Sequence, residues 1–487
     1  MSFVEPAFLL LFVPLVLIGF NVLVSTVHGR NQSGLLFLCA ASVLFYSLWG
    51  IRFLPILLLS LTINFFGARL IQNANLPNNR NILLGLALTA NVMLLTLFKS
   101  QWLTNKIMML FGATQIDGHF FPLGISFYTF TQIAYLVDVA RGATAERNPF
   151  KYVLFVTWFP HLIAGPIIHH REMMPQFESE LSKSLTHERL AVGLTWIAIG
   201  LAKKLILADS LAPGVNAAFT TPSEQLALLP AWTGALAFTL QLYFDFSGYS
   251  DMAIGLSFLF GVRMPLNFNS PYQATSIIDF WHRWHMTLSR FLRDYLYIPL
   301  GGNRRGERWK WVNIGMVMLL GGLWHGLGWT FMAWGALHGL LLILNHAWRV
   351  RFVHTSNDTF EPLGRIATFL CVVIGWVIFN AKDLGSAGHI LSAMTGIHGF
   401  STTGLNDPQL GLVLLLLIVV WWFPNSQQIL AKSQAFLTHP SLPLTTGQLW
   451  WQWRPTPAIA TLIGFTLTIG VMKMIMIPGS PFLYLQF

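Results

Sequence analysis

The chain has 487 residues, of which 54% are hydrophobic and only 10% are charged. A soluble domain usually carries about 25% charged residues, so the composition excludes a soluble enzyme and indicates a polytopic all-α protein in a lipid bilayer, with no nucleic-acid partner. The net charge of +10 is uneven, because residues 282–310 hold seven Lys or Arg against two acidic residues.

Apolar stretches of membrane-spanning length recur along the whole chain. The first resembles a signal-peptide core, but it begins with Glu5 and lacks a small-residue cleavage site, so we predict a retained helix. Segments 150–168 and 246–262 are shorter or interrupted and are candidates for re-entrant turns. The predicted spans lie near 7–27, 34–50, 53–72, 82–98, 121–139, 189–207, 228–244, 313–324, 329–346, 363–381, 409–423 and 457–477.

The distribution of Lys and Arg predicts the orientation of the chain. The loops at 28–33, 73–81 and 140–151 carry Arg30, Arg80 and three basic residues, respectively, and fall on one side if each early span crosses once. That side is the cytoplasm by the positive-inside rule, which predicts a periplasmic N-terminus. The two cysteines, Cys39 and Cys371, both lie in apolar runs, so they support neither a disulfide framework nor a metal site.

Aspartates and histidines also interrupt the apolar runs. Asp245 and Asp251 are about 240° apart on a helix, so we expect them to cap or pin a broken helix rather than form an acid–base dyad. His161 lies in a run interrupted by Pro and Gly, which suggests a re-entrant turn. His169 and His170 follow on a polar stretch, where solvation is the simpler expectation.

The segment Phe280–Tyr297 combines aromatic and basic residues. Trp281, Trp284, Leu288 and Phe291 follow helical spacing, which predicts one amphipathic helix at the cytoplasmic interface with an Arg290–Asp294 ion pair. His282 and His285 are i,i+3, but nothing near them completes a ligand set, so we predict no metal site. Arginine suits phosphate, and the candidate donor-binding residues are Arg283, Arg290, Arg293, Arg304 and Arg305. A cytoplasmic topology signal explains the same charges equally well.

Two histidines lie in one almost uncharged stretch, in the repeated motif Gly322-Leu-Trp-His-Gly326 and Gly335-Ala-Leu-His-Gly339. An ionisable side chain in hydrocarbon is costly, so His325 and His338 are candidate functional residues. On one straight helix they would be about 20 Å and about 220° apart. Either one is catalytic and the other structural, or the chain folds back at 326–329, where the glycines favour a break.

Several motifs together resemble the membrane-bound O-acyltransferase family, in the branch that acylates bacterial envelope polymers. The resemblance covers roughly residues 5–380 and rests on "FPLGISFYTF", "WFPHLIAGPIIHHREMMPQF", "QLYFDFSGYSDMAIG", "FWHRWHMTLSRFLRDYLYIPLGGNRRG" and "LGGLWHG...WGALHG". It implies a helical bundle with broken helices around a central tunnel. It assigns residues 1–380 to a catalytic core and 381–487 to an extension, in which we predict two further spans.

The resemblance implies O-acetylation of alginate, cellulose or peptidoglycan at the bacterial inner membrane. It places the family's invariant histidine at His325 and its second histidine at His338. We predict that both are catalytic, with His325 as the general base and His338 orienting it, holding the second proton or binding the acceptor. Acetyl-CoA or another thioester would be the donor substrate, with no permanently bound cofactor, and a separate periplasmic or membrane-anchored esterase-like protein would be the partner. Imidazole, with an ordinary pKa of about 6.5, suits general-base work on the polysaccharide hydroxyl.

Intramembrane histidines also suit a proton-coupled exporter, which remains the alternative, although the sequence shows no internal repeat. An assembly scaffold would need no such histidines. The sequence leaves open the polymer, the acyl group, the oligomeric state and whether an acyl-enzyme forms.

Overall fold

A computed structural model describes residues 3–26, 30–100, 103, 105–106, 109, 122–222, 225–352, 361–400, 405, 407–437, 451–476 and 482–483. Most of these residues are helical, and the strands among them are a short parallel pair formed by β1 (Met264–Pro265) and β2 (Phe436–Leu437). The predicted all-α membrane fold is therefore confirmed. Six helical stretches among the described residues are long and apolar enough to cross a membrane: Phe8–Thr26, Asn31–Asn73, Pro77–Lys99, His187–Thr220, Glu361–Asn380 and Pro457–Met476.

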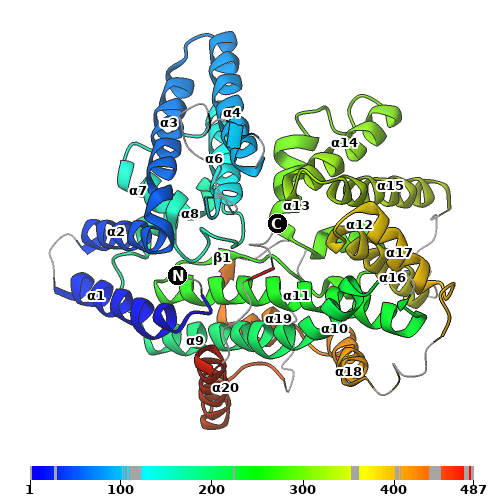
Figure 1. Cartoon of the computed structure of the whole chain (residues 1–487). Coiled ribbons are helices and arrows are strands. Elements are labelled where there is room, and N and C mark those ends of the chain that lie inside the picture. The colour runs from blue at the N-terminus through cyan, green and yellow to red at the C-terminus, as the bar shows by residue number, and fades with distance from the viewer. Residues whose placement is uncertain are drawn as a thin grey trace.

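The N-terminal helices form one side of the molecule (Figure 1). They are η1 (Phe8–Phe12), α1 (Val13–Thr26), α2 (Arg30–Gly50), η2 (Ile51–Phe53), α3 (Leu54–Asn73), α4 (Pro77–Lys99) and α6 (Ile125–Ala140). Buried amides join three of them, since Asn64 of α3 donates to Asn91 of α4 (3.1 Å) and to Gln132 of α6 (2.6 Å). Such bonds hold helices together in hydrocarbon, where the hydrophobic effect does not.

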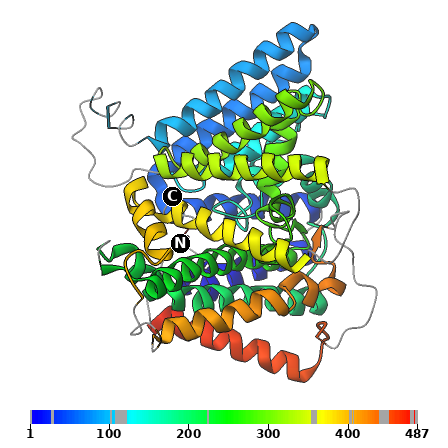
Figure 2. The ribbon, with the colours of Figure 1, turned by 90° about the vertical axis from the view of Figure 1, so that its right-hand side faces the viewer.

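The central helix α11 (Leu228–Leu259) packs along α9 (His187–Leu201), η3 (Ala202–Ala208) and α10 (Asp209–Thr220) (Figure 2). A Cβ on Gly200 would lie 2.5 Å from the Gly248 carbonyl oxygen, so glycine permits this close crossing. Because α11 runs unbroken through residue 259, the re-entrant interpretation of 246–262 is wrong.

Two adjacent lysines of η3 explain the aspartates of α11. Lys203 pairs with Asp251 and Lys204 with Asp245, each at 2.7 Å, and Lys204 also reaches Asp209 at 2.9 Å. Asp245 and Asp251 therefore anchor an unbroken helix to its neighbour and do not cap a broken one. A charge at this depth is tolerated because its partner is equally buried.

Shorter elements occur between the longer helices in the middle of the chain. They are α7 (Pro149–Thr157), α8 (His170–Ser179), η5 (Pro271–Gln273), α12 (Ile277–Arg283), α13 (Met286–Phe291) and η6 (Leu292–Tyr297). After α7 the chain continues through turns from 158 to 164 that are buried throughout, with His161 fully buried. The predicted interruption of segment 150–168 is thus present.

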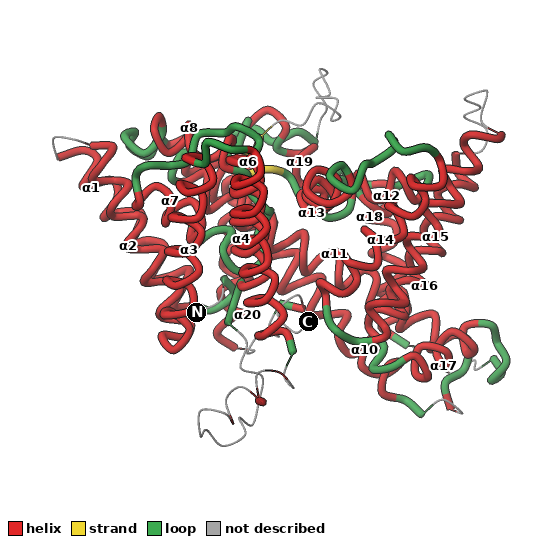
Figure 3. Tube along the Cα trace, turned by 90° about the horizontal axis from the view of Figure 1, so that it is seen from above, coloured by secondary structure: helices red, strands yellow, loops and turns green. Residues whose placement is uncertain are grey.

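The rest of the chain contributes α14 (Glu307–His325), α15 (Trp329–Phe352), α16 (Glu361–Asn380), α17 (Leu384–Met394), α18 (Pro408–Trp422), α19 (Ser426–Ile429), η9 (Ala431–Ser433) and α20 (Pro457–Met476). The boundary at 380 stays a prediction. Segments from both ends reach the interior (Figure 3). The ring of Phe3 stacks on Tyr249 of α11 at 4.6 Å, and Phe482 meets the same ring edge-on at 4.9 Å.

Candidate functional site

His325 is the last residue of α14, and the next helix begins at Trp329. The predicted break at Gly326–Gly328 is therefore confirmed. The side chain of His325 is 8% exposed. Lys99, at the end of α4, donates to the carbonyl oxygens of Trp324 and His325. The last carbonyl groups of a helix lie beyond its internal hydrogen-bond ladder, so the lysine caps the end of α14 and fixes the histidine's position.

His325 lines a small cavity of about 20 Å³, which is room for roughly one water molecule. The walls are otherwise aromatic or aliphatic, apart from a second histidine. They are Leu242, Phe246, Trp281, Trp284, His285, Leu288, Trp334, Trp376 and Phe379. The cavity therefore places two imidazoles in surroundings from which bulk water is excluded. The predicted tunnel that joins both faces stays a prediction.

The sequence alone suggests no role for His285 other than as a possible metal ligand. It lies between α12 and α13 with φ of 43°, a left-handed conformation that is unfavourable for a residue with a side chain. Its Nδ1 is 3.0 Å from Asn267 Oδ1, which also accepts from the Thr287 hydroxyl at 2.9 Å. An amide oxygen only accepts, so this geometry assigns the proton to Nδ1 and the lone pair of the neutral ring to Nε2.

His338 occupies different surroundings, near the middle of α15. It is fully buried against aromatic rings, including Phe280 and Trp281, and it does not line the cavity. Trp334 contacts both motif histidines, with ring centroids 5.3 Å from His325 and 4.9 Å from His338. The catalytic assignment of His338 stays a prediction.

The basic segment differs from the expected single amphipathic helix. The chain turns at Trp284–His285 between two short helices, and Trp281 and Trp284 are 7% and 4% exposed, too buried for headgroup contact. Their helical spacing identified buried residues correctly, but the left-handed backbone at His285 could not be read from it. The expectation of one continuous interfacial helix is therefore wrong.

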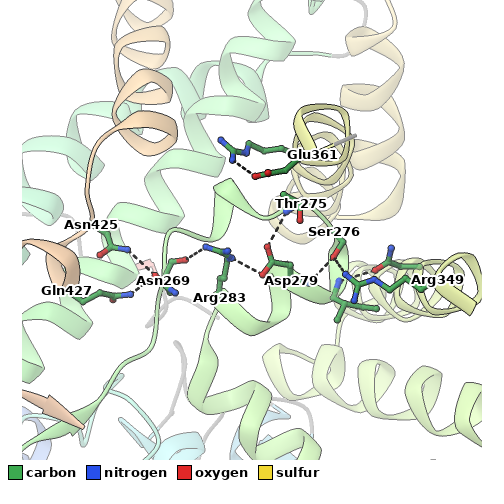
Figure 4. A network of polar contacts seen from close by, with 12 residues as sticks. Asn269, Thr275, Ser276, Asp279, Arg283, Arg349, Glu361, Asn425 and Gln427 are labelled. Carbon is green, nitrogen blue, oxygen red and sulfur yellow. Dashed lines mark hydrogen bonds and ion pairs between the residues drawn. The ribbon is translucent and has the colours of Figure 1, made fainter. Parts of the chain in front are cut away.

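Three of the five candidate arginines are neutralised by carboxylates. Arg283 pairs with Asp279 at 2.8 Å, within a polar network that continues through Asn269 to Asn425 and Gln427 (Figure 4). Arg293, and not Arg290, pairs with Asp294, at 2.7 Å. Among the described residues, Arg304 and Arg305 form no ion pair and are exposed.

Arg290 forms a bidentate pair with Glu172 at 2.6 and 2.9 Å and donates to His169 Nε2 at 2.9 Å. The predicted Arg290–Asp294 pair is therefore wrong. The prediction that His169 is solvated is also wrong, since its side chain is buried and its Nδ1 contacts the Tyr295 hydroxyl at 3.0 Å. Burial and the neighbouring Arg290 charge lower the pKa of His169 to about 3. No cluster of metal-ligating side chains occurs within the described residues.

Comparison with known proteins identifies the family of the chain. The model of the membrane-bound O-acyltransferase family matches residues 83–384, which include Lys99, both motif histidines and His285. The chain belongs to the membrane-bound O-acyltransferase family. It is therefore an acyltransferase, as the resemblance predicted.

Several curated relatives of this membrane-bound O-acyltransferase are named for an envelope polymer. The chain is 40% identical to the peptidoglycan O-acetyltransferase of Helicobacter pylori over 83% of this chain and 81% of the relative. It is 38% identical to the probable alginate O-acetylase AlgI of Azotobacter vinelandii over the full length of both. It is also 30% identical to the teichoic acid D-alanyltransferase of Bacillus subtilis, over 53% of this chain and 69% of that protein.

Proposed function

We propose that this O-acyltransferase moves an acetyl group from a cytoplasmic thioester such as acetyl-CoA to hydroxyls of an envelope polysaccharide, across the bacterial inner membrane. The names of the relatives support alginate or peptidoglycan as the polymer. Cellulose, the third candidate, is named by none of those three relatives. Membership in an acyltransferase family disfavours the exporter alternative.

The observation that carries the mechanism is that His325 and His285 line one water-poor cavity. His325 takes the proton from the acceptor hydroxyl as its oxygen attacks the acetyl carbon. The new C–O ester bond replaces the C–S bond, and the proton passes from His325 to the leaving thiolate. His285, with the tautomer set by Asn267, supplies a second imidazole at the reacting atoms.

The cavity is too small for a thioester and a sugar together, so the substrates must displace side chains as they enter. We assign the donor's phosphates first to Arg304 and Arg305, which are exposed and without carboxylate partners in the described part of the chain. Arg283, Arg290 and Arg293 would add to the positive field, reduced by their paired carboxylates. His338 would act through Trp334, which lies between it and the cavity.

The donor assignment is tested by reversing both charges, Arg304→Glu with Arg305→Glu. We expect the KM for acetyl-CoA to rise about tenfold or more with little change in kcat, and the wild-type KM to rise with salt, because exposed charges are screened. Equal KM values for the wild type and the variant at low salt would contradict the assignment and leave only a topology signal.

The remaining proposals concern topology and partners. A periplasmic N-terminus puts the basic segment on the cytoplasmic side, where acetyl-CoA is available, and the polysaccharide acceptor on the other. A separate esterase-like acetyltransferase, periplasmic or membrane-anchored, would complete the transfer.

The whole proposal is tested with the purified chain in vesicles and acetyl-CoA that carries a labelled acetyl group. Label should pass to the polysaccharide, or to the esterase-like partner when it is added, and His325→Ala should lower the rate of that transfer by about 10²- to 10⁴-fold. An exporter would be supported instead if the acetyl donor or the polysaccharide crossed the vesicle membrane unmodified and no labelled ester formed.

A further inference from the structure

Outside the candidate active site, the structure contains a groove of about 400 Å³ between α3 and the start of α7. Its lining on α3 runs along one helical face, at spacings of three and four residues, from Leu58 to Arg69. Arg147 and Pro149 close the same end as Arg69, and Phe65 and Tyr152 form part of the lining. The groove is thus apolar along most of its length and basic at one end.

We propose that this groove binds an anionic phospholipid, with one acyl chain along α3 and the phosphate between Arg69 and Arg147. The inference is independent of the proposed acetyl transfer. It concerns a lipid of the leaflet on the side of loop 140–151, bound as a specific ligand rather than as exchangeable solvent.

The dimensions fit one leaflet. Leu58 and Arg69 are eleven residues apart, about 16 Å along a helix. Arg52 and Arg69 bracket the apolar part of α3 over about 25 Å, close to the thickness of a hydrocarbon core, so Leu58 and Leu61 lie near its middle. A chain that follows this face therefore reaches from the headgroup region to the bilayer centre.

The charges at the basic end are available to a ligand. Neither Arg69 nor Arg147 forms an ion pair within the described parts of the chain, and both are exposed. The guanidinium of Arg69 is 5.2 Å above the ring of Phe65, which orients it over the groove. Glu146, the adjacent acidic residue, uses Oε1 to accept the backbone N–H of Arg147 and Asn148, each at 2.8 Å.

A phosphodiester suits this arrangement better than a free anion does. Arginine binds phosphate oxygens through its planar fork, and each basic residue near a membrane surface favours anionic lipid. The apolar wall adds affinity only when an acyl chain is attached to the phosphate. The side chains of Leu58 and Phe66 are 45% and 54% exposed, so the wall is open to a chain that arrives from the bilayer.

The test is native mass spectrometry of the purified full chain released from detergent after incubation with phosphatidylglycerol or phosphatidylcholine. The wild type should retain one phosphatidylglycerol and little phosphatidylcholine. Arg69→Gln with Arg147→Gln should weaken that retention about 10- to 30-fold. The matched control, Arg263→Gln with Arg351→Gln, removes two exposed arginines elsewhere and should retain the lipid.

A second variant addresses the apolar wall, because Thr62→Trp fills the groove and leaves both arginines in place. It should lose the lipid while keeping the wild-type elution volume in size-exclusion chromatography. Equal retention by the two double-arginine variants, equal retention of the two lipids, or displacement of the lipid by millimolar inorganic phosphate would each overturn the proposal.

Discussion

His325 and His338 lie in two copies of the same five-residue motif, Gly-x-x-His-Gly. Their surroundings nevertheless differ in nearly every respect. His325 ends a helix, is capped by Lys99 and lines a cavity with a second imidazole. His338 lies within a helix and is enclosed by aromatic rings. The glycines of the motif serve the helix contact instead, since a Cβ on Gly335 would lie 2.5 Å from the Met318 carbonyl oxygen. A repeated motif thus identifies a close helix pair, and only its surroundings distinguish the reactive histidine.

The largest expected effect separates the two histidines directly. His325→Ala should lower the rate of acetyl transfer by about 10²- to 10⁴-fold with a normal melting temperature, because a general base is lost. His338→Ala should chiefly lower stability, because a buried ring is removed from an aromatic cluster. The rate per folded molecule and the melting temperature are measured for both. Similar rate losses in both variants at unchanged stability would instead make His338 catalytic.

The next prediction concerns His285 and its positioning residue. His285→Ala and Asn267→Ala should each lower the transfer rate by roughly 10- to 100-fold, since the second imidazole is removed or loses its fixed tautomer. If Asn267 acts through His285, the double variant should be no slower than His285→Ala alone. Multiplicative losses in this double-mutant cycle would show that Asn267 acts elsewhere. Asn313→Ala, a buried amide on α14 outside the cavity lining, is the matched control.

A smaller effect is expected from crowding His338 without removing it. A Cβ on Gly375 would lie 2.9 Å from His338 Nε2, so Gly375→Ala should cost about 1–3 kcal/mol of stability through overpacking. Gly315→Ala is the control on α14, because nothing lies within 4 Å of its added Cβ. Thermal unfolding in detergent measures both. If Gly375→Ala also lowers the transfer rate per folded molecule, the aromatic surroundings of His338 take part in the reaction.

The smallest effect should come from the cap of the His325 helix. Lys99→Met removes the donor to the Trp324 and His325 carbonyls, and a bond of this kind contributes about 1.5–3 kcal/mol. Part of that loss is replaced by water, so we expect a few-fold lower transfer rate and a slightly lower melting temperature. Lys99→Arg should restore most of the rate, because it keeps a charged donor. Failure of arginine to restore any activity would argue that the amine of Lys99 acts in the reaction itself.

The comparison also shows what the sequence could reveal. The cost of ionisable groups in hydrocarbon identified His325, and the glycines after it identified the helix break, since both depend on local composition. His285 was missed because its position depends on a left-handed backbone and on Asn267, eighteen residues earlier. The ion pairs of α11 could have been predicted from the sequence. Lys203 and Lys204 lie in an apolar run, where charged side chains need acidic partners.

The contacts of Phe3 and Phe482 with Tyr249 have a consequence for assembly of the protein in the membrane. Phe3 and Phe482 are separated by nearly the whole sequence, yet both pack on the ring of Tyr249 in α11. Contacts of such large sequence separation form late, because the intervening chain must first be ordered. A nascent chain that already holds Phe3 against Tyr249 therefore still lacks the contact between Phe482 and that ring. The packing around Tyr249 is therefore completed only after Phe482 has been synthesised.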